Sequence, residues 1–121
     1  MTDKSRHARE AERIARYAKE FGMGFEQLAS IGPSVSVFGS ARIKRDDPRY
    51  AVTERLARLL SDAGFAVVSG GGPGIMEAAN RGAYAGQSTS IGLNIQLPHA
   101  QPRNHYQDIA LSFRHFFTRK V

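Results

Sequence analysis

The segment from Ser69 to Gly74, with the sequence SGGGPG, constrains the fold of this chain more than any other feature. It follows an almost continuous apolar run, Phe65 to Ser69, and precedes an alanine-rich stretch that begins at Ile75. The apolar run is typical of a strand buried on both faces of a parallel sheet, and the alanine-rich stretch is typical of a helix. A plain connecting turn needs fewer glycines, so we interpret the segment as a ligand-binding loop at the carboxyl end of a strand.

The chemistry of this loop favours a phosphate or a ribose held close to the main chain. Glycines adopt positive φ and allow a ligand to approach the backbone, and the start of the next helix offers free N–H groups and the positive end of a dipole. Two familiar nucleotide loops do not fit. The dinucleotide pattern G-x-G-x-x-G, read from Gly70, has Ile75 in place of its third glycine, and a P-loop requires a Gly-Lys-Ser/Thr sequence that does not follow.

Helices and strands alternate along the rest of the chain. We expect helices over residues 4–30, 47–64 and 75–84, strands over residues 34–39, 65–69, 89–95 and 109–113, and a further helix beginning near residue 116. This order predicts a Rossmann-like α/β fold, in which right-handed crossovers build a parallel sheet with helices on both faces. We divide the chain into an N-terminal helical extension, residues 1–33, and a nucleotide-binding domain, residues 34–121, which we expect to be incomplete at its C-terminus.

Local signals set the predicted ends of the helices. We expect Asp47 to cap the second helix and Gly64 to close it, and we expect Gly22 and Gly24 to break the first helix. The apolar residues of the second helix recur at helical spacing, which predicts that they form its buried stripe. These residues are Val52, Leu56, Leu59 and Leu60.

Composition and charge narrow the function. The formal net charge is +6, yet residues 66–97 carry only Glu77 and Arg81, while residues 98–121 carry four basic residues against one acid. A basic excess beside a neutral glycine loop fits an anionic ligand such as a phosphate. There is no cysteine and no apolar run near the roughly 20 residues that span a bilayer, so we expect a cytoplasmic protein without membrane attachment. The four histidines lack metal-ligand spacing, and no metal or organic cofactor is expected.

The predicted first strand ends in Gly39-Ser40-Ala41. Neighbouring parallel strands place their carboxyl-end loops side by side, so the Ser40 hydroxyl is a candidate ligand for whatever the glycine loop binds. An ordinary small turn residue explains Ser40 equally well.

Four ordered motifs resemble those of the Lonely Guy (LOG) family, the cytokinin riboside 5′-monophosphate phosphoribohydrolases formerly labelled lysine decarboxylases. They are VSVFGSAR, SGGGPGIMEAANRGA, GLNIQLPH and FFTRK, and the resemblance covers residues 34–121. It implies hydrolysis of the N-glycosidic bond of AMP or a cytokinin riboside monophosphate to free base and ribose 5-phosphate. It also implies that Arg119 is the catalytic arginine. The residues that it places at the substrate are Gly70, Gly71, Gly72, Gly74, Ile75 and Met76, with Lys120 beside the catalytic arginine. Ser40 joins this set through its place after the first strand.

One motif of the family, P-G-G-x-G-T-x-x-E, is absent from the sequence. The resemblance implies that it would supply the phosphate cradle and the catalytic glutamate, and that it would lie beyond Val121. Breaking the bond builds positive charge on the sugar, which a carboxylate must stabilise or relieve by activating a water. Glu77 is the only acid of the central region, and we interpret it as a surface or capping-type residue rather than the catalytic one.

Two other functions stay open at this stage. A non-enzymatic nucleotide-binding module would keep the glycine loop and lack the carboxylate. A nucleic-acid-binding protein would account for the net charge, although the neutral loop argues against it. The resemblance to the LOG family also implies a homo-oligomer, with the N-terminal helix and the cluster of Phe113, Phe116 and Phe117 as candidate surfaces.

Overall fold

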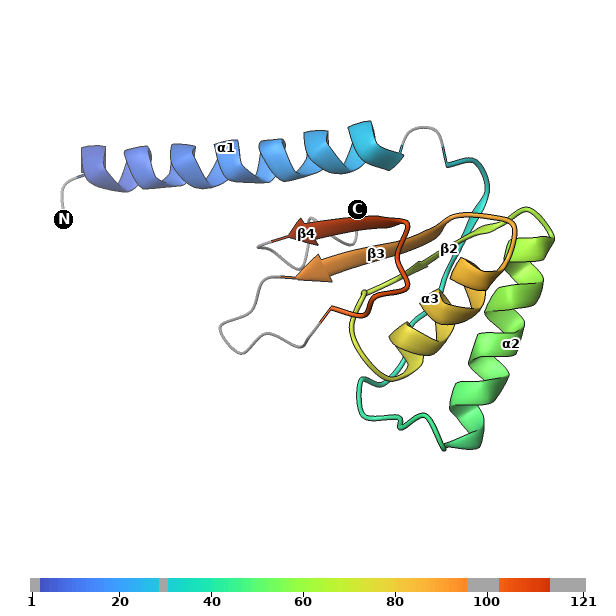
Figure 1. Cartoon of the computed structure of the whole chain (residues 1–121). Coiled ribbons are helices and arrows are strands. Elements are labelled where there is room, and N and C mark those ends of the chain that lie inside the picture. The colour runs from blue at the N-terminus through green and yellow to red at the C-terminus, as the bar shows by residue number, and fades with distance from the viewer. Residues whose placement is uncertain (1–2, 29–30, 96–102, 114–121) are drawn as a thin grey trace.

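A four-stranded parallel sheet forms the centre of the protein (Figure 1). The computed structural model describes residues 3–28, 31–95 and 103–113. The strands are β1 (Ser34–Ser36), β2 (Ala66–Ser69), β3 (Ser90–Ile95) and β4 (Ile109–Phe113), and they stand in the order β1-β2-β3-β4. The predicted α/β class and parallel sheet are therefore confirmed. The helix expected from residue 116 lies outside the described residues.

The register of the sheet fixes which side chains share a face. Val67 pairs with Ser90, and Val68 pairs with Ile91. Because paired residues of parallel strands point to the same side, Val67 and Ser90 face one way and Ile91 faces the other. Helices α2 (Pro48–Asp62) and α3 (Ile75–Ala85) cover the face that carries Val67.

Small side chains let these two helices pack closely on each other and on the sheet. A cluster of fully buried residues, with Val37 and Leu60 packed against it, forms the core between them: Ala57, Val67, Ala79 and Ala83. A Cβ added to Gly82 of α3 would collide with the backbone carbonyl of Glu54 in α2. The helix backbones therefore approach one another at a point where only glycine fits.

The predicted buried stripe of α2 is wrong for three of its four residues. Val52, Leu56 and Leu59 are 68%, 54% and 60% exposed, and only Leu60 packs against the core. The inward side of α2 instead carries Tyr50, Ala57 and Ser61, all buried. The close approach of α3 explains the difference, because that side must be lined by small or hydrogen-bonding residues, and Val52, Leu56 and Leu59 are turned to the outside.

The ends of α2 are as predicted. The side chain of Asp47 accepts a hydrogen bond from the N–H of Arg49, and Pro48 occupies the first turn. Gly64 follows the helix with φ of +99° and donates its N–H to the carbonyl of Ser61. These are the conformations that an N-terminal cap and a C-terminal glycine supply.

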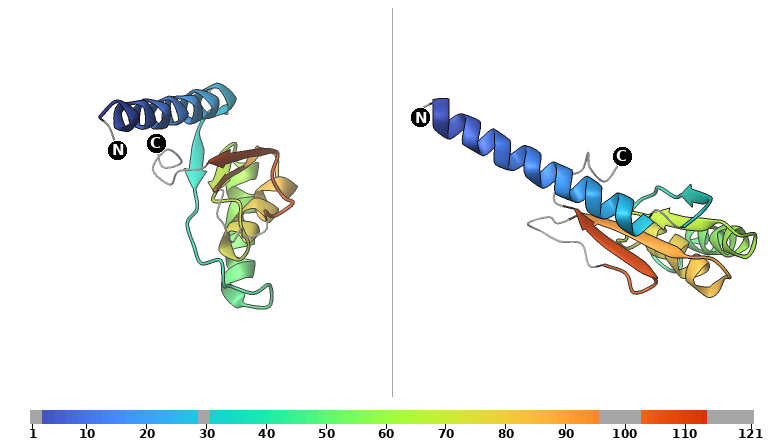
Figure 2. Two further views of the ribbon diagram at one scale, coloured as in Figure 1. Left: turned by 90° about the vertical axis from the view of Figure 1, so that its left-hand side faces the viewer. Right: turned by 90° about the horizontal axis from the view of Figure 1, so that it is seen from above.

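Helix α1 (Asp3–Leu28) is long and extends beyond the sheet (Figure 2). The break expected at Gly22 and Gly24 is wrong, since the helix runs through both glycines to Leu28. A Cβ at Gly24 would lie 3.6 Å from the ring of Phe113, on the face of the sheet opposite α2 and α3. A glycine inside a helix costs only about 1 kcal/mol, so the helix continues where the small residue fits beside the ring. No helix in the described part of the chain is long and apolar enough to cross a membrane.

Candidate functional site

The loop from Gly70 to Gly74 lies at the carboxyl end of β2 and leads directly into α3. Gly71 and Gly74 have φ of +79° and +72°, a region that side chains other than glycine rarely adopt. Gly74 is the N-terminal cap residue of α3, and no side chain caps the helix there. The start of α3 therefore lacks a side-chain cap, a feature that it shares with anion-binding helix ends.

The loop after β1 packs directly against this turn. The carbonyl of Ser40 accepts a hydrogen bond of 3.0 Å from the N–H of Ile75. A Cβ on Gly39 would collide with the Ile75 side chain, and one on Gly74 would collide with the Ser40 carbonyl. The prediction that the loops after the first two strands lie side by side is confirmed.

Not every amide of the loop is free for a ligand. The N–H of Ile75 is used by Ser40, and the N–H of Gly71 donates to the Ser69 hydroxyl at 3.0 Å. Among the described residues, no acceptor is found for the N–H groups of Gly72, Met76 and Glu77. The Ser40 hydroxyl accepts from the N–H of Arg42 at 3.1 Å, and its own hydrogen has no acceptor in the described part of the chain.

A buried hydrogen-bond network centred on Asn80 supports the loop from Gly70 to Gly74. Asn80 of α3 is fully buried, and its Oδ1 accepts a 2.5 Å hydrogen bond from the Ser69 hydroxyl. Its Nδ2 donates to the Ser90 hydroxyl and to the carbonyl of Ile91, at 3.0 and 3.1 Å. A buried amide whose groups are all bonded holds its neighbours in one arrangement. Asn80 therefore ties the start of the glycine loop to α3 and β3.

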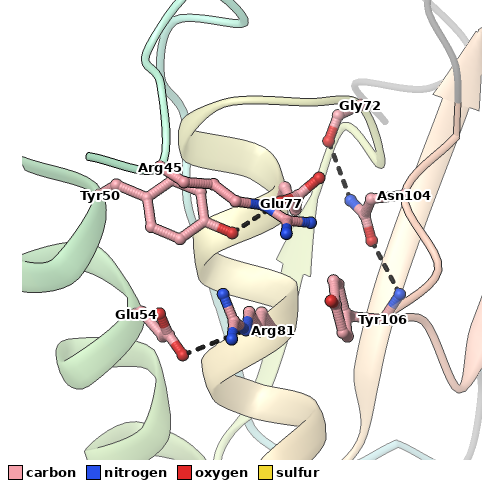
Figure 3. A network of polar contacts seen from close by, with 8 residues as sticks. All are labelled: Arg45, Tyr50, Glu54, Gly72, Glu77, Arg81, Asn104 and Tyr106. Atoms are coloured by element: carbon pink, nitrogen blue, oxygen red, sulfur yellow. Dashed lines mark hydrogen bonds and ion pairs between the residues drawn. The ribbon is translucent and has the colours of Figure 1, made fainter. Parts of the chain in front are cut away.

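A second set of contacts reaches the loop from the segment before β4 (Figure 3). The main-chain N–H of Asn104 donates to the Gly71 carbonyl at 2.9 Å, and its side-chain Nδ2 donates to the Gly72 carbonyl at 2.9 Å. The Nε2 of Gln107 also donates to the Gly71 carbonyl, at 2.9 Å. Two consecutive loop carbonyls are thus turned toward this segment.

Glu77, in the first turn of α3, lies at the centre of a charged cluster beside the loop (Figure 3). Its Oε1 accepts hydrogen bonds from the Tyr50 hydroxyl at 2.7 Å and from Nε of Arg45 at 2.8 Å. Burial alone would raise the pKa of Glu77, but these hydrogen bonds and the charges of Arg45 and Arg81 outweigh it, so its pKa lies below the usual value. Burial, followed by the bond to Glu77, raises the pKa of Tyr50.

The interpretation of Glu77 as a surface or capping residue is therefore wrong. Its side chain is only 17% exposed, and it joins the loop after β1 and helix α2 to α3. The sequence gives no local sign of this, because Arg45 stands 32 residues away and Tyr50 stands 27 residues away. Farther along α3, Arg81 contacts Glu54 at 3.5 Å and lies over the ring of Tyr106.

A model of the SLOG cluster4 family, LDcluster4, matches residues 32–115, which is more than half of the chain. This protein belongs to the SLOG cluster4 family. The SLOG superfamily also includes the LOG proteins, so the resemblance seen in the sequence is confirmed at the level of the superfamily. A search of proteins with curated descriptions gave no match.

The SLOG domain also resembles a solved structure, the X-ray structure of TM1055. The two share 23% sequence identity and superpose with a TM-score of 0.50, over 66% of this chain and 45% of TM1055. The likeness shows the fold. The SLOG chain spans less than half the length of that relative.

The SLOG fold brings some of the predicted site residues together. Ser40, Gly70, Gly71, Gly72, Gly74, Ile75 and Met76 all belong to the two adjoining loops and the first turn of α3. Arg119 and Lys120 lie outside the described residues, so their roles stay predictions. The sequence analysis missed Asn80, Asn104 and Gln107. Asn80 could have been noticed as an uncharged polar residue in an alanine-rich helix. Asn104 and Gln107 stand in a polar loop, where nothing in the sequence distinguishes them.

Among the described residues, no group of three or more His, Cys, Asp or Glu side chains is arranged to hold a metal ion.

Proposed function

We propose that this SLOG protein binds a nucleoside 5′-monophosphate at the loop from Gly70 to Met76. We further propose that it serves the hydrolysis of the N-glycosidic bond to free base and ribose 5-phosphate. The observation that carries the proposal is the uncapped start of α3 beside a loop with two positive-φ glycines, at the carboxyl end of the sheet. This combination suits a phosphate close to backbone N–H groups.

The hydrogen-bond pattern supports a particular way of binding. The amides of Gly72, Met76 and Glu77 have no acceptor among the described residues, so they are the donors for the phosphate. Ile75 contributes its position rather than its N–H, since Ser40 already accepts that hydrogen bond. The Ser40 hydroxyl stands at the same edge and can donate to a ribose or phosphate oxygen.

Hydrolysis also needs a carboxylate at the sugar. Glu77 does not suit this task, because Arg45 and Tyr50 both bond to its Oε1 and hold the carboxylate against α2 and the loop after β1. A general acid requires a raised pKa, whereas the pKa of Glu77 is lowered. The carboxylate therefore comes from a residue other than Glu77. Arg119, with Lys120 beside it, would orient that carboxylate or hold the phosphate through parallel hydrogen bonds.

The engagement of Glu77 also favours a second candidate function, a nucleotide-binding module without hydrolytic activity. Such a module needs the loop and the start of α3 and nothing more. The two functions share the binding step and differ only in the release of base.

Two measurements on the 121-residue protein separate these functions. Calorimetric titration is expected to show binding of AMP and ribose 5-phosphate at least tenfold tighter than binding of adenosine, because the phosphate makes the main contacts. Chromatography then measures adenine released from AMP, with Arg119→Ala as the control. Release that the substitution abolishes supports the hydrolase, and binding without release supports the module. Equal affinity for adenosine and AMP, or no binding of either phosphate, contradicts the proposal.

A further inference from the structure

The conformation of the glycine loop depends on a residue that neither the motifs nor the family match assigns. Asn104 lies 32 residues beyond Gly72 and is 6% exposed. Every polar group of its side chain is engaged: Nδ2 donates to the Gly72 carbonyl and to Asn80 Oδ1, and Oδ1 accepts from the N–H of Tyr106. Its main-chain N–H donates to the Gly71 carbonyl. One residue thus holds two consecutive carbonyls of the loop.

The direction of a carbonyl fixes the direction of the next N–H. The peptide between Gly71 and Gly72 is trans, so its C=O and N–H point in opposite directions. Asn104 and Gln107 hold the Gly71 carbonyl toward the segment before β4. The N–H of Gly72 must therefore point away from that segment. The Gly72 carbonyl, which would repel an anion, is held by Asn104 Nδ2.

This arrangement also requires glycine at position 71, whose carbonyl accepts the hydrogen bond from Asn104. Gly71 has φ of +79°, and a Cβ there would collide with the side-chain amide of Asn94. Asn94 in turn donates to Gln107 Oε1 at 3.2 Å. The loop is thus enclosed by side chains of β3 and of the segment before β4, which leave one orientation for its peptides.

We propose that Asn104 is a positioning residue for the glycine loop, which holds the Gly71 and Gly72 carbonyls inward and so presents the Gly72 N–H to an anionic ligand. The proposal rests on the proposed nucleotide-binding function and deepens it. A donor that is already oriented binds an anion without the entropic cost of ordering the loop. Asn104 itself touches no ligand in this account, and its effect passes through the loop.

The test uses Asn104→Ala, with Arg103→Ala as the matched control. The substitution keeps the main-chain N–H that donates to Gly71, but it removes the side-chain bonds that place this N–H there and that hold the Gly72 carbonyl. Arg103 is the exposed neighbour in the same segment and bonds to the Ser112 hydroxyl rather than to the loop. Titration with AMP is carried out at a temperature where thermal unfolding shows each protein to be folded. We expect Asn104→Ala to bind AMP at least tenfold more weakly than the unsubstituted protein. Arg103→Ala is expected to weaken binding by about threefold or less, because it loses only one exposed positive charge. Unchanged AMP affinity in Asn104→Ala overturns the proposal.

Amide hydrogen exchange gives a readout that does not depend on the ligand. The amide of Gly71 donates to the Ser69 hydroxyl and that of Ile75 to the Ser40 carbonyl. The amides of Val67 and Ile91 lie in the sheet. In Asn104→Ala we expect exchange at Gly71 and Ile75 to be at least tenfold faster, while the sheet amides keep their protection. A general loss of stability would instead accelerate all four amides together, and that result overturns the positioning role.

The two readouts separate the failure of this proposal from the failure of the proposed function. If the unsubstituted protein does not bind AMP, the proposed nucleotide-binding function is contradicted. The exchange rates then still decide whether Asn104 holds the loop. If Asn104→Ala does not fold, Asn104→Ser replaces it, because the serine hydroxyl can still accept from the N–H of Tyr106 while the Nδ2 bond to the Gly72 carbonyl is lost. Exchange and AMP affinity unchanged in Asn104→Ser then contradict the proposal.

Discussion

The carbonyl of Ser40 accepts a 3.0 Å hydrogen bond from the N–H of Ile75, which joins the loop after β1 to the start of α3. The joint leaves no space for side chains, because Cβ atoms on Gly39 and Gly74 would collide with Ile75 and Ser40. The two loops that we assign to the ligand therefore form one packed unit, and its integrity can be tested.

Gly74→Ala should disrupt this unit. The substitution combines an unfavourable positive φ with a collision against the Ser40 carbonyl, so we expect the free energy of unfolding to fall by about 3 kcal/mol or more. Gly32→Ala is the matched control, since Gly32 has nearly the same φ, +71°, and nothing within 4 Å of its added Cβ. There the loss is about 1–2 kcal/mol. Equal losses in denaturant unfolding would show that the loops are not in contact.

Glu77→Gln should lower stability in a pH-dependent way. The substitution removes the ion pair with Arg45 and weakens the bond from Tyr50, for a loss of about 1–2 kcal/mol at pH 7. Because the folded-state pKa of Glu77 lies below its usual value, its contribution is complete above the unfolded pKa of about 4.3 and disappears as the pH falls through the folded pKa.

Urea unfolding of both proteins between pH 7 and pH 3 measures this effect. The difference in free energy between the unsubstituted protein and Glu77→Gln is expected to be constant above about pH 5 and to shrink in more acidic solution. A difference that grows toward low pH would mean that the pKa of Glu77 is raised, and would make Glu77 a candidate for the catalytic acid.

Substitutions at two neighbouring residues of α2, one exposed and one buried, should affect stability to different degrees. Leu56 is 54% exposed and Ala57 is 2% exposed. Leu56→Gln is therefore expected to change the free energy of unfolding by about 0.5 kcal/mol or less, whereas Ala57→Leu overpacks the contact with α3 and costs about 1–3 kcal/mol. Thermal unfolding at low protein concentration compares the two. The reverse ranking would contradict the orientation of α2.

Sedimentation of the same proteins tests the expected homo-oligomer, which stays a prediction. If a second copy covers Val52, Leu56 and Leu59, Leu56→Gln shifts the protein toward the monomer at high concentration. If the oligomer forms elsewhere, or if there is none, the substitution leaves the sedimentation coefficient unchanged.

The sequence predicts those parts of the fold that local patterns encode. The apolar run before the glycine loop, the cap at Asp47 and the glycine at position 64 each act within a few residues, and each is found as expected. The orientation of α2 could not be predicted from its leucines. It is decided by Gly82 of another helix, which brings α3 close enough to require small residues at the contact.

The candidate site divides in the same way. Its glycines are recognisable because positive φ and close approach have a residue signature. The side chains that orient them are not, since Asn80 and Asn104 form their bonds with residues that only the folded sheet brings near. The one prediction that could have joined distant residues, the pairing of the loops after the first two strands, succeeded because parallel topology requires it.

The most direct test of the central claim is an NMR titration of the ¹⁵N-labelled protein with AMP, with adenosine as the control. The account predicts that the largest amide shifts on adding AMP fall on Gly72, Met76 and Glu77, and that adenosine leaves these amides nearly unchanged. Shifts confined to other elements, or equal shifts with adenosine, would contradict phosphate binding at this loop.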